Sequence, residues 1–339
     1  MAGLESSMAR RKVRVGLGFA CLAVMAACGG GGGDSAPPPP PPGPPPPPAV
    51  IDAVTSVETP ASYSVEQLSA FNRLNEIRAQ AELGLLASDG RLDSAAIAHA
   101  SWEVGNGLFS HVEQSGTPGY TGDSFYQRDQ YAGYQMATGG EVLAAGLSPV
   151  GSVDLLASAF YHRMIVLAPQ LVDVGLGWSD SPIAGMGRPL VMNIAIPAVS
   201  DQRGNGQGMR SGAGGLSVWP ARGATGVYTH MGPETPNPCP DLDVRGLGMP
   251  ISVRVNRWQV LQLQNLKLHD DTANGDVPIR IMTSDSDPAA MVTRDYVGGI
   301  PLAALAKDHL FSVIFQGLVD GKAISTNWQF STGSVDYQQ

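Results

Sequence analysis

Cysteine is scarce in this chain, and its positions leave no room for a disulfide. Only three cysteines occur among 339 residues. Cys21 lies within an apolar N-terminal run and Cys28 directly follows that run, so Cys239 has no partner in the rest of the sequence. Small secreted domains that lack a large core commonly depend on disulfides, and that mode of stabilisation is excluded here.

Basic charge and long apolar segments are also missing. The formal net charge is −9, and the first 27 residues contribute +3, so the remainder carries −12. Nucleic-acid binders need a basic surface to displace counterions, and no run of Lys or Arg follows residue 14, so we expect no nucleic-acid partner. No apolar segment reaches the roughly 20 residues of a spanning helix.

Several catalytic signatures are absent from the sequence. It contains no GxSxG nucleophile elbow, no CxxC, no HExxH and no P-loop. The segment Asp270–Asp276 (DDTANGD) resembles the start of an EF-hand loop, but its twelfth position is Ile281 rather than Glu. Asn274-Gly275 is a turn signal, so this segment is predicted to be a hairpin turn.

The N-terminus carries an export signal. A basic cluster at 10–14 precedes the thirteen-residue apolar run Val15–Ala27, which is typical of a signal peptide over residues 1–27. Its end, VMAAC, resembles a bacterial lipobox, although Met25 stands where Leu is usual. We therefore expect Cys28 to be acylated, with palmitate among its chains, and to anchor the protein to a membrane. The alternative is plain secretion after cleavage nearby.

Residues 28–60 are predicted to be a tether. Glycines fill positions 29–33, and eleven prolines fall between Pro37 and Pro48. Polyproline II rises about 3.1 Å per residue, which gives a stalk of roughly 35–40 Å. By resemblance to sorting signals, Gly29 rather than Asp after the cysteine indicates the outer membrane, facing either the periplasm or the exterior.

The next part of the chain mixes helices and strands. Ser64 and Gln67 form a capping box, followed by apolar residues at helical spacing. A second helix is predicted from about Ser88 or Asp93 to Val104, and a third over Val153–Leu167 with Ser152 as its cap. Strands are predicted at 172–178 and 190–196. Residues 113–140, rich in Gly and Tyr, are predicted to be a long surface loop.

The last third of the chain has a different pattern. Residues 200–215 form a Gly-rich linker, and residues 216–335 contain several short alternating segments. These lie at 251–255, 277–281, 310–315 and 328–332. Short strands with turns between them predict an all-β sandwich.

Four motifs in order resemble the CAP superfamily (cysteine-rich secretory, antigen 5 and pathogenesis-related 1 proteins; the SCP domain) in its cysteine-poor bacterial form. They are the opening motif Leu74–Arg78 with Leu92–Ala100, then Phe109-Ser110-His111, then Gly140-Glu141-Val142, and last Tyr161-His162-Arg163 with Val174–Gly177. The resemblance implies an α/β fold, an α-β-α three-layer sandwich, over residues 61–199. Residues 216–335 resemble the Ig-like domain that often follows bacterial CAP domains.

The resemblance also implies one cleft that holds His111, Glu141 and His162. Two imidazoles and a carboxylate suit Zn²⁺, and three protein ligands would leave a position for water. The alternative is that the three residues hydrogen-bond to one another. The sequence departs from the family at Leu74, Val142 and Ser158, where the family has His, Asn and a second acid.

These features lead to three hypotheses. The first is a membrane-anchored, extracytoplasmic and non-enzymatic CAP lipoprotein whose His/Glu cleft binds a small-molecule, lipid or other envelope ligand. The second is a zinc-dependent hydrolase that acts on an envelope or extracellular substrate. The third is a structural or adhesion protein of the envelope.

Overall fold

A computed structural model describes residues 53–146, 148–198 and 215–335. Several predictions fall outside the described residues. They concern the signal peptide, the acylation of Cys28, the polyproline stretch and nearly all of the Gly-rich linker. Among the helices described, none is long and apolar enough to cross a membrane.

The N-terminal domain is built on a four-stranded sheet with the order β1-β3-β4-β2. The strands are β1 (Ala87–Ser88), β2 (Met136–Gly146), β3 (Asp173–Trp178) and β4 (Arg188–Pro197). β1 pairs with β3 in parallel, whereas β4 pairs antiparallel with both β2 and β3. The predicted strands at 172–178 and 190–196 are confirmed as β3 and β4.

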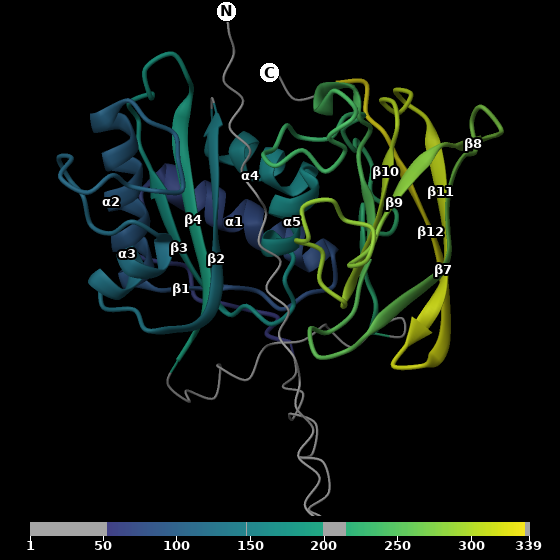
Figure 1. The fold of residues 1–339 in the computed structure, drawn as a ribbon, viewed down its shortest axis with the longest axis horizontal. Coiled ribbons are helices and arrows are strands. Elements are labelled where there is room, and N and C mark those ends of the chain that lie inside the picture. Colours follow the sequence, from purple (N-terminus) through teal and green to yellow (C-terminus); the bar gives the residue numbers. More distant parts are fainter. Residues whose placement is uncertain (1–52, 147, 199–214, 336–339) are drawn as a thin grey trace, which may run out of the picture. The chain divides into compact units, whose positions relative to one another are not determined.

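Helices cover both faces of this sheet, which confirms the predicted three-layer fold (Figure 1). The helices are α1 (Val65–Gln80), α2 (Gly90–Asn106), α3 (Phe125–Tyr131), α4 (Pro149–Ser158) and α5 (Phe160–Val166). Even-numbered strand residues such as Val142 and Met192 pack with α1, α4 and α5, while odd-numbered residues such as Leu143 and Val191 pack with α2. The alternation follows from the two-residue period of a strand.

Two glycines allow α2 to lie directly on β3. A Cβ atom at Gly175 would come within 2.1 Å of the Leu92 carbonyl carbon, and one at Gly177 within 2.1 Å of the Ala96 carbonyl oxygen. No residue larger than glycine fits at this distance, so the GLG segment serves close packing between a helix and a strand.

The C-terminal domain consists of two antiparallel four-stranded sheets, β5-β6-β10-β9 and β12-β11-β7-β8, which confirms the all-β prediction. The elements are β5 (Ser217–Trp219), η3 (Val244–Gly246), β6 (Ile251–Arg254), β7 (Leu261–Asp270), β8 (Gly275–Val277), β9 (Ile279–Met282), β10 (Tyr296–Pro301), β11 (Leu310–Val319) and β12 (Lys322–Ser331). Apolar side chains such as Val253, Phe315 and Phe330 fill the core between them. The predicted hairpin turn is present between β7 and β8, where Asn274 has a φ of 53°.

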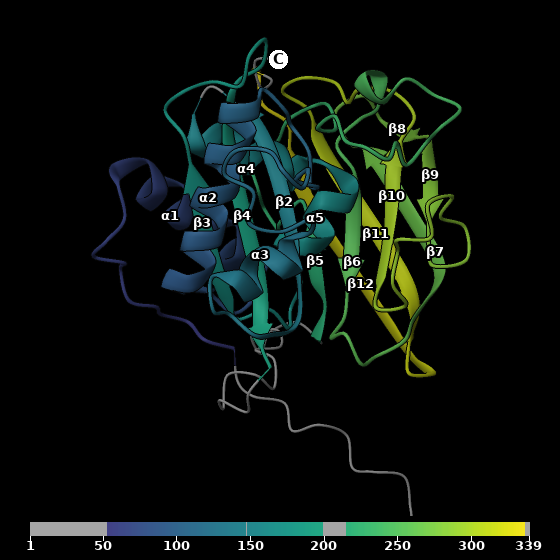
Figure 2. The same ribbon diagram turned by 60° about the vertical axis from the view of Figure 1, so that its left-hand side comes forward.

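The two domains also share a core of their own. It forms where α5 lies beside the C-terminal strands (Figure 2). Phe160, Tyr161 and Met164 of α5 pack in one cluster with residues of the C-terminal domain such as Met282 and Tyr296. The indole of Trp219 on β5 packs against the N-terminal core. The sequence pattern gives no sign of this contact.

Two predictions for the N-terminal domain are wrong. Residues 113–140 are not one long loop, because they contain α3 and the first half of β2. The third helix does not run unbroken over Val153–Leu167: α4 begins after Ser148, and Ala159, with an extended ψ of 152°, separates it from α5. This break gives α5 an N-terminus of its own.

Candidate functional site

The candidate site centres on His111, which lies in the loop after α2. Its side chain is 50% exposed, and its Nδ1 lies 2.9 Å from Oε1 of Glu141, a fully buried carboxylate on β2. An ionised carboxylate only accepts hydrogen bonds, so Nδ1 carries the proton. Within the described residues Nε2 has no hydrogen-bond partner. The buried carboxylate therefore fixes the orientation of the exposed imidazole through Nδ1, and Nε2 is available to a ligand.

Arg128 on α3 holds Glu141 in place. One of its terminal nitrogens donates to both carboxylate oxygens, at 2.8 and 2.7 Å, and the guanidinium also donates to the backbone carbonyl of His111 at 3.2 Å. Burial alone would raise the pKa of Glu141, but the hydrogen bond from His111 and the charge of Arg128 outweigh it and lower that pKa. Glu141 is therefore an anion that is already paired with a cation.

A second buried pair lies beside the first. Nδ1 of His99 on α2 is 2.9 Å from Glu113, and its Nε2 is 2.9 Å from the carbonyl oxygen of Ser110. Burial lowers the pKa of His99, yet both ring nitrogens face oxygen atoms. Glu113 also accepts hydrogen bonds from the backbone N–H groups of Thr121 and Gly122. The His99–Glu113 pair is fully buried, and Nε of Arg128 lies 3.8 Å from the same Glu113 carboxylate.

Two further acids nearby, Glu103 and Asp129, are fully buried. Burial raises the pKa of Glu103 to about 8 and that of Asp129 to about 7. Glu103 accepts a hydrogen bond from the backbone N–H of Ser110, and Asp129 accepts one from Asn193. His111 is the exposed member of this otherwise buried group of side chains.

His162, the third residue expected in the cleft, makes a different contact. Its Nδ1 lies 3.1 Å from Oε2 of Glu234, which belongs to the C-terminal domain. The same carboxylate accepts the backbone N–H groups of Phe160 and Tyr161 at 2.7 and 2.8 Å. Glu234 thus supplies the cap that the sequence of α5 lacks, and it joins the two domains. The structure pairs His111 with Glu141 and His162 with Glu234.

The donor set does not fit the expected zinc ion. Among the residues the structure describes, no three or more His, Cys, Asp or Glu side chains are grouped so that they could hold a metal ion. Both oxygens of Glu141 face the guanidinium of Arg128, so a second cation there would meet a positive charge within hydrogen-bond distance. We derive no metal-dependent step.

Sequence reasoning missed Arg128, Glu113 and Glu234. A signal for α3 was present, since Ser124 and Gln127 repeat the capping box of Ser64 and Gln67. That helix would have placed Arg128 on an ordered element. Glu234 had no such signal, because its bonds to α5 span more than 70 residues of sequence.

Comparison with known proteins finds a family similarity within the N-terminal domain. The family model described as CAP, the cysteine-rich secretory protein family, matches residues 71–184. An extracellular protein containing an SCP domain from Bacillus anthracis is 25% identical with a TM-score of 0.33; the match covers 38% of this chain and 40% of that one. An outer surface protein from Borrelia burgdorferi is 16% identical with a TM-score of 0.33, over 38% of this chain and 89% of that one. No curated protein matches the sequence.

Proposed function

From the match of residues 71–184 to the CAP family model, we propose that this protein is a lipid-anchored, non-enzymatic protein of the cell envelope that binds a ligand at His111. The observation that carries the proposal is the half-exposed imidazole fixed by a buried Glu141–Arg128 pair. A surface histidine needs no such support for solubility, whereas a binding group gains affinity when its orientation is set in advance.

The chemistry of binding follows from the proton on Nδ1. In the neutral imidazole Nε2 is an acceptor and takes a hydrogen bond from a hydroxyl or amide group of the ligand. In the protonated form Nε2 is a donor and favours an anionic group instead. Nε2 can therefore bind either kind of group, and the contact of Nδ1 with Glu141 is the same in both cases.

The surroundings of His111 support binding rather than turnover. In the described part of the chain, no hydroxyl or thiol is hydrogen-bonded to this imidazole, as a base-activated nucleophile would be. The hydrolase hypothesis also needs His162 beside His111, and His162 contacts Glu234. Zinc calorimetry that shows equally weak binding by wild type and His162→Ala would remove that alternative.

The test of ligand binding compares two surface histidines of similar geometry. The full chain is purified from membranes, and its native mass spectrum is recorded with that of His111→Ala. The control is His269→Ala, which removes an imidazole whose Nδ1 also meets a carboxylate, that of Asp276, at 2.8 Å. We expect a retained small molecule or lipid in wild type and His269→Ala, and its loss in His111→Ala. Identical spectra for all three proteins, or turnover of peptides, lipids or peptidoglycan that His111→Ala abolishes, would refute the proposal.

The anchor is tested separately. Cells that express the full chain are grown with labelled palmitate, and the label should be found on the wild-type protein and be missing from Cys28→Ser. Several acyl chains give stable anchoring, so wild type should remain with the membranes while the variant is released. Equal labelling of both proteins would disprove acylation at Cys28.

A further inference from the structure

A cavity of about 150 Å³ lies where the two domains meet, apart from the residues of the His111 site. The N-terminal domain lines it with α1 and α4, and the C-terminal domain with β5, the segment that follows and Met249. An engineered cavity of this volume accepts a single six-membered ring. It is smaller than the roughly 300–1,000 Å³ of sites for drug-sized ligands. One ring is therefore the size of ligand that fits.

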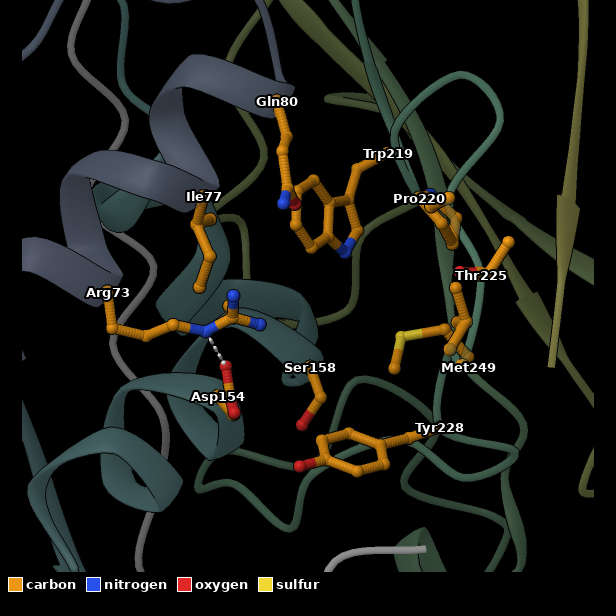
Figure 3. Close-up of a pocket in the computed structure, with 14 residues that line it drawn as sticks. Arg73, Ile77, Gln80, Asp154, Ser158, Trp219, Pro220, Thr225, Tyr228 and Met249 are labelled. Carbon is orange, nitrogen blue, oxygen red and sulfur yellow. Dashed lines mark hydrogen bonds and ion pairs between the residues drawn. The ribbon is translucent and has the colours of Figure 1, made fainter. Parts of the chain in front are cut away.

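The walls of the cavity differ in character. Figure 3 shows Arg73 and Asp154 on one side, with Trp219 and Met249 on another. Ser158 and Tyr228 add hydroxyl groups to the lining. The flat indole favours a ligand with an apolar face, and the opposing polar groups favour one whose edge carries hydrogen-bonding groups.

The charges in the cavity select against ions. Nε of Arg73 lies 2.6 Å from Oδ1 of Asp154, and the two side chains are 28% and 15% exposed. Nη1 of Arg73 is also 2.8 Å from Glu76, which does not line the cavity. The two charges in the lining offset each other: an anion would meet Asp154 and a cation would meet Arg73. A ligand without net charge therefore fits best.

The hydrogen-bonding capacity is mixed. Within the described residues, Nη2 of Arg73 and Nε1 of Trp219 make no hydrogen bond, so each offers a donor. Oγ of Ser158 donates to the backbone carbonyl of Leu155, which leaves its lone pairs free to accept. Hydroxyl groups, which both donate and accept, match such a set.

We propose that this cavity binds one neutral sugar ring, with the apolar face of the ring on Trp219 and its hydroxyl groups on Arg73, Asp154 and Ser158. The site draws residues from both domains, so the bound ring stabilises their contact. The proposal uses none of the residues around His111, and its outcome is independent of the proposed function.

The experiment titrates the full chain with methyl β-D-glucopyranoside and with methyl N-acetyl-β-D-glucosaminide, followed by saturation-transfer NMR and isothermal calorimetry. A neutral ligand of this size should bind with a Kd of about 1 mM. Arg73→Gln and Asp154→Asn should each weaken binding about 5-fold or more through the loss of a charge-assisted hydrogen bond. Trp219→Phe, which keeps an aromatic face but lacks the N–H, should weaken it about 3-fold.

Trp258→Phe is the matched control, because Trp258 is an exposed tryptophan of the same domain that does not line the cavity. It should bind as wild type does. Circular dichroism of each variant confirms that it is folded. The proposal is overturned if neither sugar binds saturably at about 50 mM, or if Asp154→Asn and Trp219→Phe both bind like wild type. Tighter binding of trimethylglycine, a zwitterion, than of either sugar would also overturn it.

Discussion

The chain contains two histidine–glutamate contacts, and the two glutamates differ in the other groups to which they are hydrogen-bonded. Behind His111, Glu141 is paired with a buried guanidinium, and the imidazole remains half exposed. Behind His162, Glu234 accepts backbone N–H groups of α5, and the imidazole is 17% exposed at the contact between the domains. Although the family resemblance groups both histidines in one cleft, only the first has the exposure of a binding group.

The two histidines make the same kind of contact in different places in the fold. A carboxylate from the C-terminal domain binds the N-terminus of the helix that carries His162, so this histidine belongs to an interface between domains. His111 is supported entirely by the N-terminal domain. If this distinction is correct, substitutions behind His111 act within the N-terminal domain, and substitutions at Glu234 act on the contact between the domains.

The largest effect is expected from Arg128→Met. This change leaves Glu141 buried without its cation, and breaking a buried ion pair on one side costs about 3–5 kcal/mol. Urea unfolding of the full chain measures the loss. The double variant Arg128→Met with Glu141→Gln removes both charges and should recover most of the stability. A loss of under about 1 kcal/mol for the single variant would show that Glu141 reaches water.

A pH effect of about 3–4 kcal/mol between pH 5 and pH 8 is expected from Glu103. Burial raises its pKa from 4.5 to about 8, so the folded state holds a proton that the unfolded state releases above pH 4.5. Folding then binds a proton, and the free energy of unfolding falls as the pH rises from about 5 to 8. Glu103→Gln keeps the shape of the side chain but cannot titrate, so the free energy of unfolding of this variant should fall less with pH. Denaturant unfolding of wild type and variant at pH 5 and pH 8 measures this decline. If the free energy of unfolding falls equally steeply in the variant, other groups cause the decline.

Glu234→Gln tests the role of the second glutamate in the contact between the two domains. The amide loses the negative charge and one of the acceptor oxygens that meet the backbone of α5, at a cost of about 2 kcal/mol. Unfolding followed by calorimetry should show a lower Tm, while ligand retention at His111 is unchanged. A lost ligand with an unchanged Tm would place Glu234 in the binding site instead.

Much of the N-terminal fold could be predicted from local patterns. The capping box at Ser64 defines the start of α1, and alternation along 190–196 defines β4, because each signal lies within a few residues. β2 was missed: its sequence, MATGGEVLAAG, has three glycines and few β-branched residues, and pairing with β4 rather than propensity makes it a strand.

The candidate site was predictable only in part. His111 and Glu141 were identified from the motifs that carry them, and the structure joins them. Arg128 was missed because its helix, α3, falls within the segment predicted to be a loop. The partner of His162 could not be found locally, because Glu234 lies 72 residues further along the chain and meets α5 only when the two domains pack.

The smallest effect, and the one that bears most directly on the comparison, is expected from His111→Ala. Its imidazole is half exposed and Glu141 keeps its ion pair with Arg128, so the free energy of unfolding should change by less than about 0.5 kcal/mol. His162→Ala, which removes a more buried ring at the domain contact, should cost about 1 kcal/mol. Urea unfolding of both variants, with His269→Ala as the surface control, measures which substitution lowers the free energy of unfolding more. Should His111→Ala prove the more costly of the two, the imidazole belongs to the structural network, and its role as a preorganised binding group is lost.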